Sequence, residues 1–364
     1  MRLHWFLRLT LLLLFLVLLW IFVGFILPRL LPVASVSNTS KFGFIFRKEE
    51  WSGDIKIVGD LWALPGTTVS VKPGSKILVA KEGDNFNLHW LPWELRSGLN
   101  TGTESLGVKN GELYFDEKQK IQVHLAKFFV WGTKEQPVEI RSDETRPGSP
   151  YDFNVIKMDE GIISHVVMSN YRKFLVGGNT TIRESEFDVV GECAVCTKYA
   201  SPSIFKNIFK GSLRTSILVV GGSPKINDNL FLGVGEGITV DPKRFGAPII
   251  YHNNFEVDGV ALRFLTGSEE VGGAVALNDF AGPSAITIPC DSRIKFVQNQ
   301  IKGVFRLAPS GNCSGSMALG PNYWLSADRQ AILREKIVGR EQRFEVLLPT
   351  VLQSSPSGVG RRID

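Results

Sequence analysis

Apolar and polar positions repeat along residues 182–324, with a step of 21 to 25 residues. In each repeat an asparagine follows an apolar residue by three positions and precedes another by two, as in Ile204, Asn207 and Phe209. Upstream, Ser185 takes the same slot. The asparagines in this register are Asn207, Asn229, Asn253, Asn278, Asn299 and Asn322.

The odd separation of the two apolar positions predicts a bend at each asparagine. Side chains of a uniform strand alternate between faces, so the chain must turn if both apolar residues point inward. An asparagine at the bend can adopt left-handed backbone and bond to neighbouring backbone groups. Stacked about 4.8 Å above its equivalent in the next coil, its amide can extend a hydrogen-bonded ladder. The period and the missing helical limb therefore favour a parallel β-helix over a leucine-rich repeat.

Segments before and after the repeat extend this pattern. Residues 66–79 and 128–142 each have the pattern strand, turn, strand, and Asn322-Tyr323-Trp324 precedes a helix expected over 326–338. These features resemble the opening and closing coils of exported right-handed parallel β-helix proteins, the pectin-lyase-like superfold. Leu325 departs from the group, in which glycine usually follows the tryptophan.

The resemblance covers roughly residues 51–352. It implies an all-β, right-handed parallel β-helix solenoid closed by a short C-terminal capping helix. It leaves function open, because the superfold carries lyases, hydrolases, adhesins and modules without catalysis.

The N-terminus predicts a membrane segment. Residues 9–27 contain no charge and are mostly Leu, Phe, Val and Ile, and about 20 apolar residues cross a bilayer as a helix. Arg2 and Arg8 precede the run, which favours a cytoplasmic N-terminus. A cleaved signal peptide is the alternative, with Val33-Ala34-Ser35 as a loose cleavage site.

The expected organisation follows from these segments. We expect a cytoplasmic N-terminus at 1–8, a transmembrane helix or uncleaved signal anchor at 9–27, and a stalk with an entry strand at 28–50. An extracytoplasmic β-helix domain should follow at 51–352, with an insertion at 84–106. Residues 353–364 are rich in Ser, Gly, Pro and Arg, which is typical of a disordered tail.

Composition excludes several function classes. The chain carries 41 Lys and Arg against 36 Asp and Glu, a net charge of +5, without a basic cluster, so no nucleic-acid partner is expected. With five His and four Cys, and no ligand-spaced pair of histidines, we expect neither a metal site nor a cofactor.

The cysteines leave alternatives open. Cys290 and Cys313 are one coil apart in sequence, so a disulfide between them is one interpretation and a pair of buried ladder positions is the other. Cys193 and Cys196 form a Cys-x-x-Cys pair whose redox state the sequence leaves open.

The candidate catalytic residues are Asp241, Asp258, Asp279 and Arg263. Polysaccharide hydrolases of the superfold use clustered aspartates together with a nearby His and an Arg-x-Lys fragment. Of these, only the Arg-x-Lys fragment is matched here, by Arg293-Ile294-Lys295. Asp258 lies five positions after its repeat asparagine and Asp279 lies one after, so the two are out of phase. We therefore expect no catalysis.

The best aromatic pair for ligand contact is Trp90 and Trp93, inside the 84–106 insertion. They are candidates for stacking on a sugar or contacting a partner, or alternatively for covering the end of the solenoid. The leading hypothesis is a membrane-anchored extracytoplasmic β-helix that binds an envelope polysaccharide or a surface protein without cleaving it. A polysaccharide lyase or glycosidase with a loop-built site is the first alternative, and a structural or adhesive spacer is the second.

Overall fold

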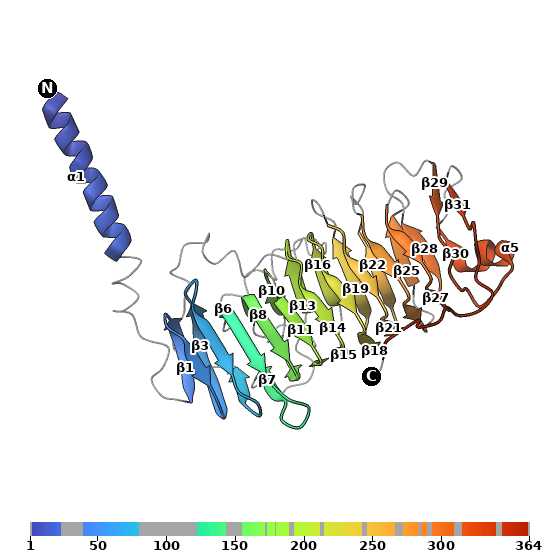
Figure 1. The fold of residues 1–364 in the computed structure, drawn as a ribbon, viewed down its shortest axis with the longest axis horizontal. Helices are drawn as coiled ribbons and strands as arrows, with labels where there is room; N and C mark the ends of the chain where they lie inside the picture. The colour runs from blue at the N-terminus through green and yellow to red at the C-terminus, as the bar shows by residue number, and fades with distance from the viewer. Residues whose placement is uncertain are drawn as a thin grey trace.

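The protein is a parallel β-solenoid, seen here in a computed structural model (Figure 1). Within the described residues, all strands but two join one 29-stranded sheet, and every strand pair whose register is defined is parallel. The all-β solenoid expected from the repeat is therefore confirmed. The structure describes residues 2–22, 39–79, 122–142, 155–171, 173–178, 180–188, 193–211, 215–241, 246–265, 272–282, 285–289, 293–308, 315–339 and 344–362.

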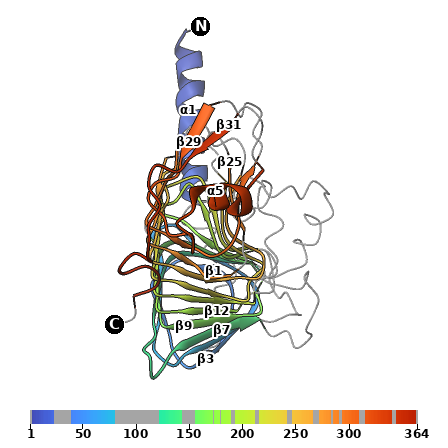
Figure 2. The ribbon, with the colours of Figure 1, turned by 90° about the vertical axis from the view of Figure 1, so that its right-hand side faces the viewer.

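Three stacks of strands form the faces of the solenoid, which we call A, B and C. Figure 2 shows the molecule viewed down the solenoid axis. Three long strands turn a corner and serve two faces: β3 (Asp54–Ala63) serves faces B and C, and β6 (Gln122–Trp131) and β8 (Val155–Ser164) serve faces C and A. The other strands of face A are β2 (Glu49–Trp51), β4 (Thr68–Val71), β11 (Thr180–Arg183), β14 (Ser203–Phe205), β17 (Lys225–Asn227), β20 (Ile249–Tyr251), β23 (Ala274–Ala276) and β26 (Lys295–Val297).

Faces B and C are built in the same way. Face B adds β5 (Lys76–Val79), β7 (Val138–Ser142), β9 (Val166–Ser169), β12 (Glu186–Asp188), β15 (Ile208–Lys210), β18 (Leu230–Leu232), β21 (Asn254–Glu256), β24 (Asp279–Phe280) and β27 (Gln300–Ile301). Face C adds β1 (Ser40–Ile45), β10 (Lys173–Val176), β13 (Cys193–Lys198), β16 (Thr215–Val220), β19 (Glu236–Asp241), β22 (Val260–Phe264), β25 (Ala285–Pro289), β28 (Phe305–Ala308) and β30 (Ile337–Val338).

The interior is stacked coil upon coil. The apolar residues two positions after the ladder residue form a column of phenyl rings along face B, with centroids of successive rings 4.7 to 5.2 Å apart. Burying each such ring removes it from water, which contributes about 1.5–3 kcal/mol. The column consists of Phe187, Phe209, Phe231, Phe255 and Phe280.

The six repeat asparagines form a continuous hydrogen-bonded ladder. Each is fully buried, and from Asn229 to Asn322 each side-chain oxygen accepts from the backbone N–H and the amide of the preceding asparagine at 2.9–3.0 Å. The side-chain oxygen of Asn207 accepts from the backbone N–H of Ser185 at 3.1 Å. The amide nitrogens also donate to main-chain carbonyls of the preceding coil, as Asn253 does to Ile226. Because these carbonyls lie at the corner between faces A and B, the ladder satisfies backbone groups that the turn removes from strand pairing.

The bend itself lies one residue earlier than expected. We allowed for left-handed backbone at the asparagine, but the residue before it has φ of 51° to 56° in each coil from Glu184 to Gln298. The asparagine must keep its amide in the ladder, so its neighbour takes the left-handed conformation.

The C-terminal cap is shorter than the helix expected over 326–338. An α-helical turn, α5 (Arg329–Ala331), continues into a π-helical turn, η6 (Ile332–Lys336), and the chain then enters β30 on face C. Asp328 caps the start by accepting from the backbone N–H groups of Gln330 and Ala331. β29 (Gly315–Ala318) and β31 (Phe344–Leu347) form a separate parallel pair. Leu325, which follows Trp324, has φ of +60°.

Residues 353–362 belong to the segment for which composition suggested a disordered tail. They lie back along the outside of the solenoid, where Arg362 reaches Asp228. The segment has a low apolar content, which is why its composition suggests disorder. It is held on the coils by polar and charged contacts instead.

The expected membrane helix, the insertion and the second cysteine pair lie outside the part of the solenoid described above. Helix α1 spans Arg2–Ile21; within the described residues, no helix combines the length and hydropathy of a membrane span. The 84–106 insertion with Trp90 and Trp93, and both members of the pair Cys290 and Cys313, lie outside the described residues. The handedness of the coil and the pectin-lyase-like superfold stay predictions.

Candidate binding cleft on the A–B corner

The left-handed residues at the corner between faces A and B form one outward column. Five of its backbone N–H groups donate to a carbonyl of the next coil, as from His165 to the Arg183 carbonyl and from Lys206 to the Asn227 carbonyl. We call this set the corner column. Its members are His165, Glu184, Lys206, Asp228, His252, Leu277 and Gln298.

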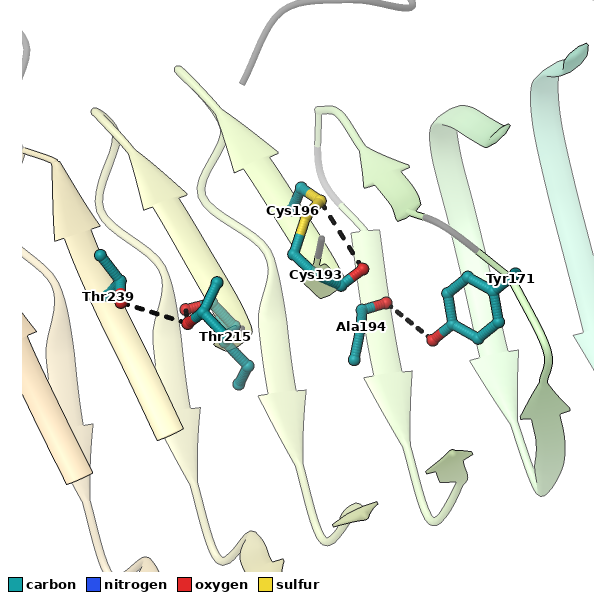
Figure 3. Close-up of a disulfide and its surroundings, with 7 residues drawn as sticks. Tyr171, Cys193, Ala194, Cys196, Thr215 and Thr239 are labelled. Carbon is teal, nitrogen blue, oxygen red and sulfur yellow. Dashed lines mark hydrogen bonds between the residues drawn. A yellow bond between two sulfur atoms is a disulfide. The ribbon is translucent and has the colours of Figure 1, made fainter. Parts of the chain in front are cut away.

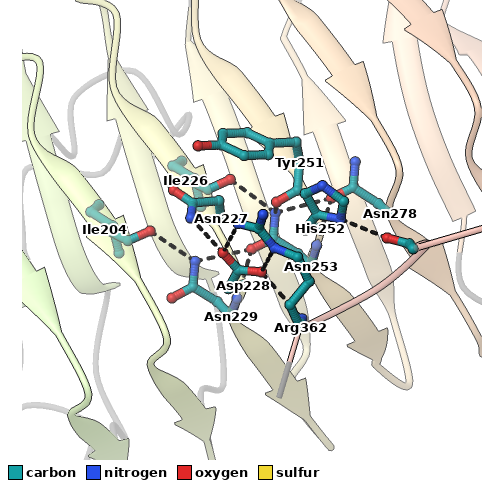
Figure 4. A network of polar contacts seen from close by, with 11 residues as sticks. Ile204, Ile226, Asn227, Asp228, Asn229, Tyr251, His252, Asn253, Asn278 and Arg362 are labelled. Atoms are coloured by element: carbon teal, nitrogen blue, oxygen red, sulfur yellow. Dashed lines mark hydrogen bonds and ion pairs between the residues drawn. The ribbon is translucent and has the colours of Figure 1, made fainter. Parts of the chain in front are cut away.

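The C-terminal segment, residues 353–362, occupies part of the surface along this column, and we call it the strap. The carbonyl of Gly358 accepts from the Nδ1 of His252 at 2.7 Å, and the Gly360 N–H donates to the Leu277 carbonyl at 2.8 Å. The Arg361 N–H then donates to the Asn254 side chain at 2.7 Å. The strap therefore runs towards the N-terminal coils, between the corner column and face B (Figures 1 and 4).

Asp228 anchors the end of the strap. Its carboxylate accepts from the Nε and NH2 atoms of Arg362 at 2.8 and 2.7 Å, from the Arg362 backbone N–H at 3.2 Å, and from the Asn227 amide at 2.7 Å (Figure 4). Burial alone would raise the pKa of Asp228. The hydrogen bonds from Arg362 and Asn227 and the charge of Arg362 outweigh burial and lower the pKa to about 2.

An open cleft of about 640 Å³ continues the strap's path towards the N-terminal coils. Its walls include the corner-column residues His165, Glu184 and Lys206, and its floor includes Val167 and Ile208 on the outer side of face B. The turn between β6 and β7 contributes Thr133, Lys134 and Pro137, and the strap contributes Arg361 and Arg362. The volume lies in the range of roughly 300–1,000 Å³ that is typical of ligand sites.

Basic side chains outnumber acidic ones in the cleft. Glu186 accepts from Lys210 at 2.7 Å, and Glu184 lies 3.8 Å from both the His165 ring and Arg183. Both carboxylates therefore have basic neighbours. Lys134, Lys206, Arg361 and Arg362 also line the cleft. Within the described residues, no acidic partner is found for the side chains of Lys134 and Arg361.

A pair of aromatic rings, one exposed and one half-buried, lies beside this turn. Phe129 and Trp131 project from the outer side of face A with their rings parallel within 5° and their centroids 6.4 Å apart. Trp131 is 43% exposed and precedes the cleft residue Thr133 by two positions. Aromatic faces of this kind can stack on the apolar face of a sugar or on another planar group.

The candidate catalytic residues fall on different faces. Asp279 lies on face B, 3.7 Å from Lys302, whereas Asp241 and Arg263 lie on face C. Arg263 contacts Glu236 at 2.6 Å and none of the three candidate aspartates. Asp258 is exposed in the turn between β21 and β22. No group of three or more potential metal ligands occurs in the described part of the chain.

The Cys-x-x-Cys pair is a disulfide. Cys193 and Cys196 are bonded to each other on β13, and both are buried (Figure 3). The adjacent Tyr171 hydroxyl donates to the Ala194 carbonyl at 2.9 Å, and burial raises the pKa of that phenol well above its usual value. The sequence left the state of this pair open because spacing alone does not distinguish a disulfide from two thiols.

The sequence contained a signal for the cleft that we did not use. His165, Glu184 and Lys206 each precede a ladder position by one residue, so the repeat already placed them in one column. His252 holds the strap, but His165 lines the cleft.

Comparisons with protein-family models, with curated proteins and with solved structures found no match to this chain.

Proposed function

We propose that this chain is an exported, membrane-anchored binding protein whose cleft holds an anionic segment of an envelope polysaccharide without cleaving it. The solenoid, which we take to be right-handed and of the pectin-lyase-like type, presents the cleft on its A–B corner. The observation that carries this proposal is the excess of basic side chains around an open cleft with a partly apolar floor.

The charge of the cleft supports an anionic ligand. Lys134, Lys206 and Arg361 come from three separate segments and line the same space. Hydrogen bonds from cationic donors to carboxylates are roughly twice as strong as neutral ones. The apolar floor and the nearby Phe129–Trp131 pair favour a ligand with sugar rings over a small inorganic anion.

Two features support export and anchoring. The uncharged run at 9–27 fits a membrane anchor, with residues 1–8 in the cytoplasm. The Cys193–Cys196 disulfide fits an oxidising compartment outside the cytoplasm. Protease treatment of intact cells should degrade the solenoid, and mass spectrometry should recover peptides of 9–27 from the membrane fraction. A mature chain that begins near Val36 would exclude the anchor.

Calorimetric titration tests the binding function. The detergent-solubilised full chain should bind a β-1,4-linked glucuronate hexamer at least ten-fold more tightly than cellohexaose, which has the same backbone without carboxylates. Lys206→Gln should weaken binding of the acidic hexamer, and Lys295→Gln, an exposed change on face A, should not. Added salt should weaken binding because it screens exposed charges. No heat with the acidic hexamer, or equal affinity for both sugars, would exclude the proposal.

An extended peptide is a second candidate ligand. The observation in its favour is the strap itself, a peptide segment bound along the same corner through backbone hydrogen bonds to His252, Leu277 and Asn254. A glutamate hexapeptide carries the same number of side-chain carboxylates as the glucuronate hexamer. Tighter binding of the peptide would make a surface protein the partner, and release of shortened sugar products would favour the lyase or glycosidase alternative.

A further inference from the structure

One wall of the cleft comes from the far end of the chain. Arg361 and Arg362 line the cleft together with His165, Glu184 and Lys206, which lie more than one hundred positions earlier. Every other described residue around the cleft belongs to the coils or to the turn between β6 and β7. The cleft therefore has its full set of basic groups only when the strap is docked.

The strap is held at closely spaced points on both sides of Arg361. Before it, the N–H of Gly360 donates to the Leu277 carbonyl, and φ of Gly360 is +81°. A Cβ at Gly360 would lie 2.3 Å from the Asn254 side-chain oxygen, so only glycine fits there without movement. After it, Arg362 is fixed on Asp228 by two side-chain hydrogen bonds.

Among the described residues, Arg361 is held through its backbone. Its N–H donates to Asn254 at 2.7 Å, and its side chain lines the cleft without an acidic partner in the described residues. Arg362 next to it is already committed to Asp228. Two consecutive arginines thus have different surroundings: one anchors the strap and the other faces the ligand space.

We infer that the docked strap is part of the binding site and that it places Arg361 as the specificity-determining cation for a ligand carboxylate. This inference rests on the proposed function. A guanidinium offers paired donors that match the two oxygens of a carboxylate, whereas lysine offers a single charged point. Because the strap is docked at Gly360 and Arg362, the backbone of Arg361 is already ordered before the ligand binds. The entropic cost of ligand binding is therefore lower.

Three variants of the full chain test the role of the Arg361 side chain. Arg361→Gln should weaken binding of the glucuronate hexamer about ten-fold, the effect of losing one charge-assisted hydrogen-bond pair, and should leave cellohexaose binding unchanged. Arg361→Lys should restore part of the affinity, because it returns the charge without the paired geometry. Arg293→Gln, the same change at an exposed site beside face A, is the matched control and should bind like wild type.

A second set of variants tests the docking of the strap. Gly360→Val should displace the segment and weaken hexamer binding about as much as Arg361→Gln, although Arg361 is still present. Adding Arg361→Gln to Gly360→Val should then cause little further loss, because the side chain has already left the cleft. An unchanged circular dichroism spectrum would show that the solenoid is intact in each variant.

The outcomes separate the two proposals. If wild type binds the acidic hexamer and Arg361→Gln binds it equally well, the inference is wrong and the proposed function stands. If Gly360→Val binds like wild type, docking does not position Arg361 and the inference is also wrong. If wild type binds no acidic hexamer, the proposed function fails and the inference fails with it.

Discussion

The guanidinium of Arg362 donates two hydrogen bonds to the carboxylate of Asp228, 134 positions earlier in the chain. The carboxylate is nearly inaccessible to solvent, with 2% of its side chain exposed, whereas 54% of the arginine side chain is exposed. A buried carboxylate without this partner would bear the cost of desolvation unpaired. The contact therefore ties the end of the strap to the middle of the solenoid and stabilises the corner residue at the same time.

Acid should release the strap. The pKa of Asp228 in the folded protein is about 2, below its unperturbed value of 3.8. A lowered pKa contributes stability that is complete above the unperturbed value and is lost as pH falls through the folded one. The contribution should be on the order of 1 kcal/mol, because Arg362 is half exposed and solvent screens the pair.

Amide chemical shifts of Gly360 and Arg362, followed by NMR from pH 6 to about pH 1, measure this release. Their transition should have its midpoint near 2, and Arg362→Gln should move the midpoint of the Asp228 resonance upward. A midpoint near 3.9, the ordinary value for an aspartate, would show that the pair does not form in solution.

Loss of one ladder asparagine should be strongly destabilising. Asn253 donates to Ile226, Tyr251 and Asn278 and accepts from the N–H and amide of Asn229. Asn253→Leu removes all of these bonds and leaves buried polar groups without partners, at about 1–3 kcal/mol for each. Chemical denaturation should show a loss of about 2–5 kcal/mol. The exposed control Lys225→Ala should change the free energy of unfolding by less than about 0.5 kcal/mol, and equal values for the two would contradict the ladder.

Replacing Leu325 with glycine should stabilise the protein. Leu325 is 51% exposed with φ of +60°, so its side chain adds little burial while its backbone is held in the left-handed region. That conformation costs a non-glycine residue about 1–2 kcal/mol. Leu325→Gly should therefore raise the melting temperature. Leu347 on strand β31 is also partly exposed, at 39%, and has no positive φ, so Leu347→Gly should lower the melting temperature. A lower melting temperature for Leu325→Gly would mean that its side-chain contacts outweigh the strain.

The disulfide should be present in purified protein and should contribute modestly. Peptide mapping after alkylation without reductant should find Cys193 and Cys196 linked within one peptide. The loop that they close contains few residues, so the chain-entropy model gives about 2 kcal/mol. Replacing both cysteines with alanine should lower the free energy of unfolding by no more than that amount plus a small contribution from lost packing. Alkylation of both thiols in the unreduced protein would contradict the assignment.

The solenoid could be predicted because its information is local and repeated. Six asparagines in one register indicate a ladder, and the odd spacing of Ile204 and Phe209 indicates a corner. The exact left-handed residue was missed by one position, because asparagine favours that conformation intrinsically but is needed by the ladder here.

The repeat aligns the corner residues of the cleft, but the strap and the extent of the cleft could not be predicted, since they depend on contacts between distant residues. Nothing near Arg362 indicates Asp228, and a segment rich in Ser, Gly and Pro has the composition of a disordered tail. The strap covers the corner at Asp228 and His252 but leaves it open at Lys206 and Glu184. The cleft begins where the strap ends. The period of the repeat contains no information about that boundary.

Hydrogen-exchange footprinting of the full chain with the glucuronate hexamer tests the central claim most directly. The account predicts that the bound sugar slows amide exchange in three separate segments, 133–137, 165–167 and 206–208, and in the strap at 360–362, while faces A and C beyond the corner exchange as before. Cellohexaose at the same concentration should give no such protection. Protection confined to the 84–106 insertion, or none at saturating hexamer, would contradict the account.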